Sequence, residues 1–167
     1  MGRSSSRGML SASCLCGGVQ IAVSGKVGPL VYCHCSRCRK SSGTAFSANV
    51  NVRRTYWRFA AGEELVREFE SSPGVYRAFC SRCGSPVYSR WDADPDMLRL
   101  RLGLVDGDPG RRSLAHFYVG SKAAWFEIVD SLPQFERGPA DHEAEIAERL
   151  GHRDPSTQRP RGPGGDP

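Results

Sequence analysis

The chain has 167 residues, of which 39% are apolar and 25% are charged, and its formal net charge is +5. This length suits one domain of ordinary size, and no segment approaches the roughly 18 consecutive apolar residues that a membrane-spanning helix needs. The basic residues are scattered and form no basic block, so the composition favours neither nucleic acid nor membrane as a partner.

The two ends of the chain have the composition of tails. Residues 1–10 combine Ser, Gly and Arg without the apolar run of a secretory signal, which predicts a disordered leader and a cytoplasmic protein. Residues 138–167 end in a Pro/Gly/Arg-rich segment that predicts a disordered tail. Within that tail, good helix formers between Asp141 and Gly151 predict a short helix over residues 141–150.

Between the tails, short alternating runs separated by Gly, Pro, Asp and Ser predict β-strands. The clearest run is 97–105, where leucines at the even positions share one face while Arg99 and Arg101 share the other. Such a pattern is typical of a half-buried antiparallel strand. The acidic run at residues 92–96 predicts a turn. The expected strands are residues 19–24, 44–52, 56–59, 65–70, 75–80, 86–90, 97–105 and 114–119. We therefore expect a mainly β fold with short helical turns and one core, over residues 11–137.

Seven cysteines fall into three tight clusters, and their odd number excludes complete disulfide pairing. Thiols only a few residues apart converge on one point more easily than they pair across a fold, and in a reducing cytoplasm such clusters usually bind metal. Gly17 and Gly84 directly follow two of the clusters and suit a tight backbone that turns amide groups toward metal-bound sulfur. The clusters are Cys14 and Cys16; Cys33, Cys35 and Cys38; and Cys80 and Cys83.

Spacing alone leaves two groupings of the clusters open. In the first, the outer two clusters form a four-thiolate structural zinc site, and the middle cluster forms a three-thiolate site with one free position, as reactive metal sites have. In the second, the CxxC pairs at 35/38 and 80/83 form an ordinary zinc ribbon, which leaves Cys33 and the first pair unused. Two zinc ions on seven thiolates would also lower the formal charge to about +2.

The stretch from Cys14 to about Pro139 resembles the family of glutathione-dependent formaldehyde-activating enzymes, which also includes centromere protein V. All three cysteine clusters occur in the family's order. The matching segments are CLCG at 14–17, YCHCSRCRKSSG at 32–43, FCSRCGS at 79–85, AW at 124–125 and LPQF at 132–135.

This resemblance implies a β-tent of antiparallel sheets organised around two zinc ions. It implies a structural zinc on the outer four cysteines, and a second zinc through which the middle three act in catalysis. The four are Cys14, Cys16, Cys80 and Cys83; the three are Cys33, Cys35 and Cys38. Named members are described as carbon–sulfur lyases that join formaldehyde to glutathione. Because one fold can serve several functions, the resemblance carries the fold and the metals with more force than the substrate.

Three functions are compatible with these residues. The first is a zinc-dependent carbon–sulfur lyase-like protein that acts on thiol–aldehyde adducts, with a small thiol such as glutathione as its partner. The second is a non-catalytic zinc-stabilised scaffold, as centromere protein V suggests for some relatives. The third is a redox sensor built on the metal-bound thiolates of the middle cluster.

Several side chains near the middle cluster are candidates for supporting roles. Arg39 and Lys40, together with Arg37, are expected either to hold the carboxylates of a thiol substrate and offset thiolate charge, or to be solvated surface charge. A fourth protein ligand would close the site. His34 is poorly placed for this because it sits between two ligands, and His116 is more simply read as an ordinary sheet histidine.

Overall fold

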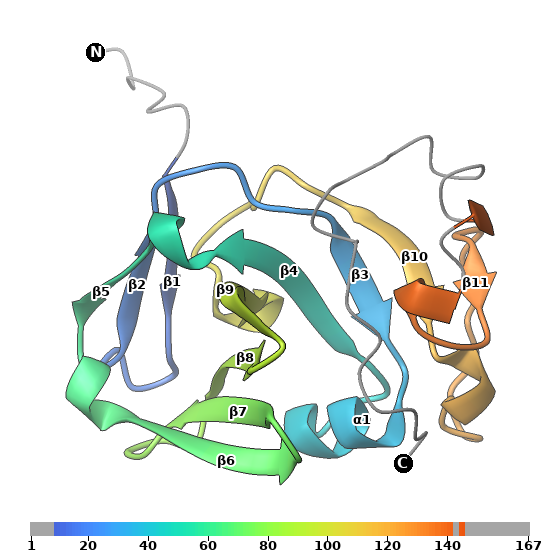
Figure 1. Ribbon diagram of the computed structural model, residues 1–167, viewed down its shortest axis with the longest axis horizontal. Coiled ribbons are helices and arrows are strands. Elements are labelled where there is room, and N and C mark those ends of the chain that lie inside the picture. The colour runs from blue at the N-terminus through green and yellow to red at the C-terminus, as the bar shows by residue number, and fades with distance from the viewer. Residues whose placement is uncertain (1–8, 142–143, 146–167) are drawn as a thin grey trace.

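The computed structural model describes residues 9–141 and 144–145 and contains two β-sheets (Figure 1). The smaller sheet has three antiparallel strands in the order β1-β2-β5. The turn between β1 and β2 and the segment after β5 lie at the same end of this sheet (Figure 1). The strands are β1 (Leu10–Ser13), β2 (Gln20–Val23) and β5 (Trp57–Ala61).

The larger sheet has eight strands in the order β11-β10-β3-β4-β9-β8-β7-β6. Its neighbours are antiparallel except at β10, which runs parallel to both β3 and β11. Its strands are β3 (Leu30–Cys33), β4 (Ser47–Arg53), β6 (Val66–Ser72), β7 (Val75–Cys80), β8 (Pro86–Trp91), β9 (Asp94–Arg101), β10 (Ser113–Phe117) and β11 (Gln134–Phe135).

The helices within the described ranges are short, and all those before β11 lie between strands. Helix α1 (Ser36–Ser42) follows β3 directly and lies near β4 and β7 in Figure 1. It ends at Gly43, whose left-handed conformation lets its N–H bond to the carbonyl of Arg39. The 3-10 helices are η1 (Arg54–Tyr56), η2 (Glu63–Leu65), η3 (Leu102–Leu104), η4 (Val119–Ser121) and η5 (Pro139–Asp141).

The main core lies where the small sheet packs against the inner face of the large one. Alternation along each strand places one set of aliphatic side chains on this face. Ile21 and Val23 come from β2, Val50 and Val52 from β4, and Leu100 from β9, and all are at most 2% exposed. Burying a side chain of this kind contributes roughly 1.5–3 kcal/mol relative to leaving it exposed. The core therefore fixes the two sheets against each other.

A second, smaller cluster lies at the other end of the large sheet, so the expectation of a single core is wrong. Ala115 and Phe117 of β10 pack there with Phe135 of β11, and the two phenylalanine rings stack with centroids 4.9 Å apart. The sequence did not indicate this cluster because β11 has only two residues, too few to show an alternation.

The mainly β fold class is confirmed, and each expected strand has a counterpart. Two expectations are wrong at β9, which begins at Asp94 and ends at Arg101: the turn expected at 92–96 covers only residues 92–93, and the strand expected at 97–105 ends four residues earlier. The chain then forms η3, which keeps Leu104 buried while bringing Val105 beside Ala12 of β1. The alternation of apolar residues extends past the end of β9 because Leu104, which lies in η3, still packs in the main core.

Four elements were not expected: β1, β3, β11 and α1. β1 starts at Leu10, the last residue of the expected leader. Most of the expected leader and tail, and residues 142–143 and 146–150 of the expected helix, lie outside the described residues.

Candidate metal centres

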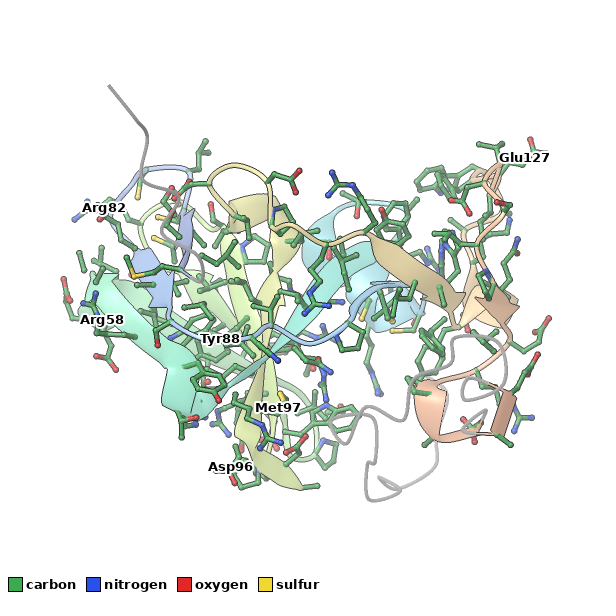
Figure 2. All side chains as sticks on the ribbon, turned by 90° about the horizontal axis from the view of Figure 1, so that it is seen from above. Arg58, Arg82, Tyr88, Asp96, Met97 and Glu127 are labelled. Carbon is green, nitrogen blue, oxygen red and sulfur yellow. The ribbon has the colours of Figure 1, made fainter. Side chains whose placement is uncertain are left out.

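Four cysteines from two distant parts of the chain meet at one end of the two sheets. Their sulfur atoms all lie within 4.8 Å of one another, with 3.5 Å between Cys14 and Cys16 and 3.9 Å between Cys16 and Cys80. The first pair comes from the β1–β2 turn and the second, Cys80 with Cys83, from the β7–β8 turn. Sulfur atoms are visible next to the labelled Arg82 in Figure 2. This quartet therefore bridges the small and the large sheet.

Two tight turns of the backbone bring the four cysteines of the quartet together. Gly17 and Gly84 have φ angles of +70° and +75°, which favour glycine, and each donates its N–H to the carbonyl of the cysteine that opens its turn at 2.8 Å. The expected tight turns are present, although these two amides point to carbonyl oxygens. The backbone N–H of Val19 does reach sulfur, 3.2 Å from Cys14 Sγ.

The pKa of Cys83 is lowered to about 5 by hydrogen bonds, first from the Ser85 hydroxyl and then from backbone amides. The Cys83 and Ser85 side chains lie 3.2 Å apart. A thiol with this pKa is largely ionised at neutral pH, which is the form that binds metal.

The other three cysteines form a separate group at the junction of β3 and α1. The sulfur atoms of Cys33, Cys35 and Cys38 also lie within 4.8 Å of one another. Cys35 is the N-cap of α1, and its Sγ accepts the backbone N–H of Cys38 at 3.3 Å. Within the described part of the chain, no His, Cys, Asp or Glu supplies a fourth ligand atom to this trio.

All seven cysteines are free thiols, and they group as four plus three. The zinc-ribbon alternative, which joins the pairs at 35/38 and 80/83, is not the grouping that the fold brings together. Both groups have the soft sulfur donors that suit a thiophilic divalent ion. The quartet and the trio could therefore each hold a metal ion.

Two arginines that sequence analysis did not single out lie beside the trio. Arg77 of β7 places Nη1 3.9 Å from Cys38 Sγ and 3.2 Å from Ser41 Oγ, while its Nε donates to Ser71 Oγ at 3.0 Å. Arg101 of β9 is only 4% exposed, and its Nη2 donates to the same Ser41 hydroxyl at 3.3 Å. Both guanidinium groups thus converge on α1.

Arg101 is held by neutral oxygens from β4. Its Nη1 donates to Asn49 Oδ1 at 2.7 Å and to the hydroxyl of Ser47, and Nε has no hydrogen-bond partner within the described ranges. Burial lowers the pKa of this guanidinium, and attraction to Cys38 opposes that shift. The alternating pattern placed Arg101 on the face opposite the leucines, but it could not show that this face is covered, because the cover comes from distant strands and from α1.

The electrostatics of the trio are asymmetric. Hydrogen bonds from Cys33 and Cys35 lower the pKa of Cys38 well below its usual value, and attraction to Arg77 and Arg101 adds to this. The pKa of Cys33 is raised, mainly by its hydrogen bond with Cys35. In the metal-free protein, negative charge therefore concentrates on the sulfur that faces the two arginines.

The side chains expected beside the cluster lie in different settings. Arg39 is half-buried and donates its Nε to the carbonyl of His34 at 3.3 Å, while Lys40 is exposed. Their contact with the carboxylates of a thiol substrate stays a prediction.

The two histidines considered as closing ligands form a hydrogen-bonded chain away from the trio's sulfur atoms. His34 Nε2 lies 2.8 Å from His116 Nδ1, and His116 Nε2 lies 3.1 Å from both carboxylate oxygens of Asp130. Burial, with repulsion from His116, lowers the pKa of His34 to about 4. Together they join β3, β10 and the segment before β11.

A cavity of about 320 Å³ lies between the two sheets and contains no cysteine. Figure 2 labels two of its lining residues, Arg58 and Tyr88. The full lining is Arg54, Trp57, Arg58, Phe59, Glu63, Tyr88 and Leu98. Because no cysteine of either group lines it, this cavity is not part of the metal centres.

Residues 9–121 match the family model described as glutathione-dependent formaldehyde-activating enzyme. The chain belongs to this family. Its relatives in the family include a protein of Halomonas elongata, named as a candidate glutathione-dependent formaldehyde-activating enzyme, which is 32% identical over 86% of this chain and 97% of its own length. A Colletotrichum graminicola protein of the same name is 31% identical over 51% of this chain and 44% of its own.

The fold of this family member also has a counterpart among solved structures. A crystal structure of a Rhodobacter sphaeroides protein matches with a TM-score of 0.50 and 21% identity, over 60% of this chain and 92% of the other. At this identity the likeness speaks for the fold alone. No helix in the described residues is long and apolar enough to cross a membrane.

Proposed function

We propose that this protein is a zinc-dependent, carbon–sulfur lyase-like enzyme that acts on thiol–aldehyde adducts of the S-hydroxymethylglutathione type. One observation carries the proposal: the fold forms one group of four sulfur atoms and one group of three. The described residues add no fourth ligand to the group of three. The family name and that of the Halomonas elongata relative support glutathione and formaldehyde as the two components.

The two cysteine groups have different roles in this proposal. The quartet has the four ligands of a structural zinc site, which leaves no position for a substrate. The trio has the three protein ligands of a site that keeps one position open. Cys33, Cys35 and Cys38 would hold a zinc ion there, which would supply a binding position for a substrate sulfur and favour its deprotonated form at neutral pH.

The chain's own residues prepare the reaction around the trio. α1 fixes Cys35 and Cys38 one helical turn apart, and β3 delivers Cys33 to the same point. Arg77 and Arg101 place positive charge beside the sulfur atoms. In the synthetic direction a thiolate bonds to the aldehyde carbon, the carbonyl π pair moves to oxygen, and that oxygen takes a proton from water. The reverse reaction breaks the carbon–sulfur bond.

Exchange spectroscopy by NMR tests the proposed activity. In a mixture of formaldehyde and glutathione, the zinc-loaded protein is expected to accelerate exchange between free thiol and hemithioacetal. The Cys35→Ser variant, which lacks one ligand of the trio, serves as the matched control and is expected to show only the uncatalysed rate. A wild-type protein that carries two zinc ions and still leaves exchange at the uncatalysed rate would exclude the enzyme and favour the scaffold alternative.

A further inference from the structure

Two guanidinium groups meet beside the trio, and no acidic residue among those that the structure describes pairs with either of them. Arg77 and Arg101 both donate to the hydroxyl of Ser41, which in turn donates to the carbonyl of Cys38. Neither makes an ion pair with an Asp or Glu in the part of the chain that the structure describes. Arg90 shows the contrast, because its guanidinium binds the carboxylates of Glu68 and Asp92 at 2.7 and 2.8 Å.

Such an arrangement is unfavourable unless negative charge lies close by. A buried cation needs a partner, and two cations that share one hydroxyl repel each other. A divalent ion on three thiolates carries one net negative charge, which balances one arginine. One positive charge therefore remains for a ligand that the chain does not supply.

The contacts of Arg101 indicate that it acts through its charge and not through hydrogen bonds to a substrate. Its Nη atoms are already engaged by Asn49, Ser47 and Ser41, and the side chain is 4% exposed. A substrate carboxylate has no clear route to those donors. Arg77 is only half-buried and directs Nη1 toward Cys38 Sγ. Both arginines thus act most directly on charge at the sulfur atoms.

We propose that Arg77 and Arg101 are the counter-ions for a fourth, exogenous thiolate, so that the trio's metal takes an anionic sulfur ligand in preference to a neutral one. This inference rests on the proposed function, because it needs a metal ion at the trio. It goes further by naming the charge of the incoming ligand: the site favours an anionic sulfur. With that thiolate bound, two negative charges face two arginines.

The test is isothermal titration calorimetry on zinc-loaded protein with three small ligands: 2-mercaptoethanol, glutathione and imidazole. The Arg77→Met variant is expected to bind both thiols about tenfold more weakly than wild type, the effect of one close charge, and to bind imidazole equally well. Arg77→Lys keeps the charge and is expected to bind thiols within about threefold of wild type. Each protein is first shown by metal analysis to carry two zinc ions.

A matched control lies on the same face of the sheet. Arg67 of β6 is exposed and donates to the carbonyls of Glu64 and Val66. Arg67→Met removes the same charge from that face and is expected to leave thiol binding unchanged. If Arg101→Met folds, it should repeat the Arg77→Met result; if it does not fold, Arg77→Met and Arg77→Lys still decide the question.

Three outcomes would overturn the counter-ion role. One is unchanged binding of 2-mercaptoethanol by Arg77→Met; another is weakening for glutathione alone, which would indicate contact with a carboxylate. The third is equal weakening for imidazole, which would indicate a purely structural effect. The result is separable from the proposed activity: arginine-dependent thiol binding without accelerated exchange sustains this inference and rejects the lyase, whereas accelerated exchange with arginine-independent binding does the reverse.

Discussion

The quartet and the trio use the same ligand atom in different surroundings. The quartet joins the β1–β2 turn to the β7–β8 turn, so it links the small sheet to the large one across 64 residues between Cys16 and Cys80. The trio closes within six residues at one strand–helix junction. A link between distant segments removes more freedom from the unfolded chain than a local one, although the difference grows slowly with the length of the loop. The comparison teaches that two groups with the same ligand atom differ in what they connect, and the different roles that we propose for them follow from their positions in the fold.

The largest effect is expected at the quartet. Cys83→Ser removes one of four ligands from the link between the sheets, and structural zinc sites contribute on the order of 10 kcal/mol to folding in small domains. We expect this variant to be poorly folded, with dispersed amide resonances lost from its NMR spectrum. A Cys83→Ser protein with the thermal stability of wild type would contradict the structural role.

A smaller effect on the fold is expected at the trio. Cys35→Ser should stay folded and bind one zinc ion instead of two, as counted by native mass spectrometry. Serine is a favoured N-cap, so its oxygen can still accept the N–H of Cys38 and α1 should persist. Cys35→Ala is the companion variant; it also loses the cap and should be less stable than Cys35→Ser by about 1 kcal/mol. Equal stabilities would argue against capping by this residue.

The histidine chain beside the trio should make stability depend on pH. The folded-state pKa of His34, about 4, lies below the ordinary histidine value of 6.5, so the unfolded chain binds its proton first as pH falls. Stability should therefore decrease through this window, by about 2 kcal/mol between pH 7.5 and pH 5. Chemical denaturation at both pH values measures it. In His34→Asn the decrease should be smaller by that amount, and identical slopes would contradict the assignment.

The smallest effect is expected at Arg90, which has acidic partners, whereas Arg77 and Arg101 have none within residues 9–141 and 144–145. The hydrogen bond from Arg90 lowers the pKa of Glu68, so this pair stabilises the fold above about pH 4.5 and the contribution is lost as pH falls further. Because both side chains are partly exposed, Glu68→Gln should cost no more than about 1 kcal/mol at pH 7. Zinc content and thiol binding should be unchanged, and a change in either would show coupling that the geometry does not indicate.

Local sequence patterns predicted the bounds of a strand correctly where the alternating run ends at the same residue as the strand. The run at 75–80 is strand β7 with the expected bounds, because alternation and the Cys-Ser-Arg-Cys turn coincide there. The run at 97–105 extended past the end of β9 because Leu104 remains buried after the strand has ended. Strand β11 is too short to produce any periodic signal.

For the candidate sites, residues that are close in sequence were predicted, and residues that only the fold brings together were not. Clustered cysteines indicated metal binding because the ligands of each cluster are close in sequence, and the family resemblance grouped the clusters as the structure does. Arg77 and Arg101 were missed because the fold brings them to the trio from distant parts of the chain: Arg101 pairs with Asn49 of β4, and Arg77 lies 39 positions after Cys38. The sequence instead indicated Arg39 and Lys40, because they are neighbours of the cluster along the chain.

Zinc X-ray absorption spectroscopy tests the division between the quartet and the trio most directly. With seven free cysteines shared between two ions, the account predicts an average of three and a half sulfur ligands per zinc, which rises to four when 2-mercaptoethanol is added. A spectrum that shows four sulfur ligands per zinc without added thiol, or one that does not change when thiol is added, would contradict it.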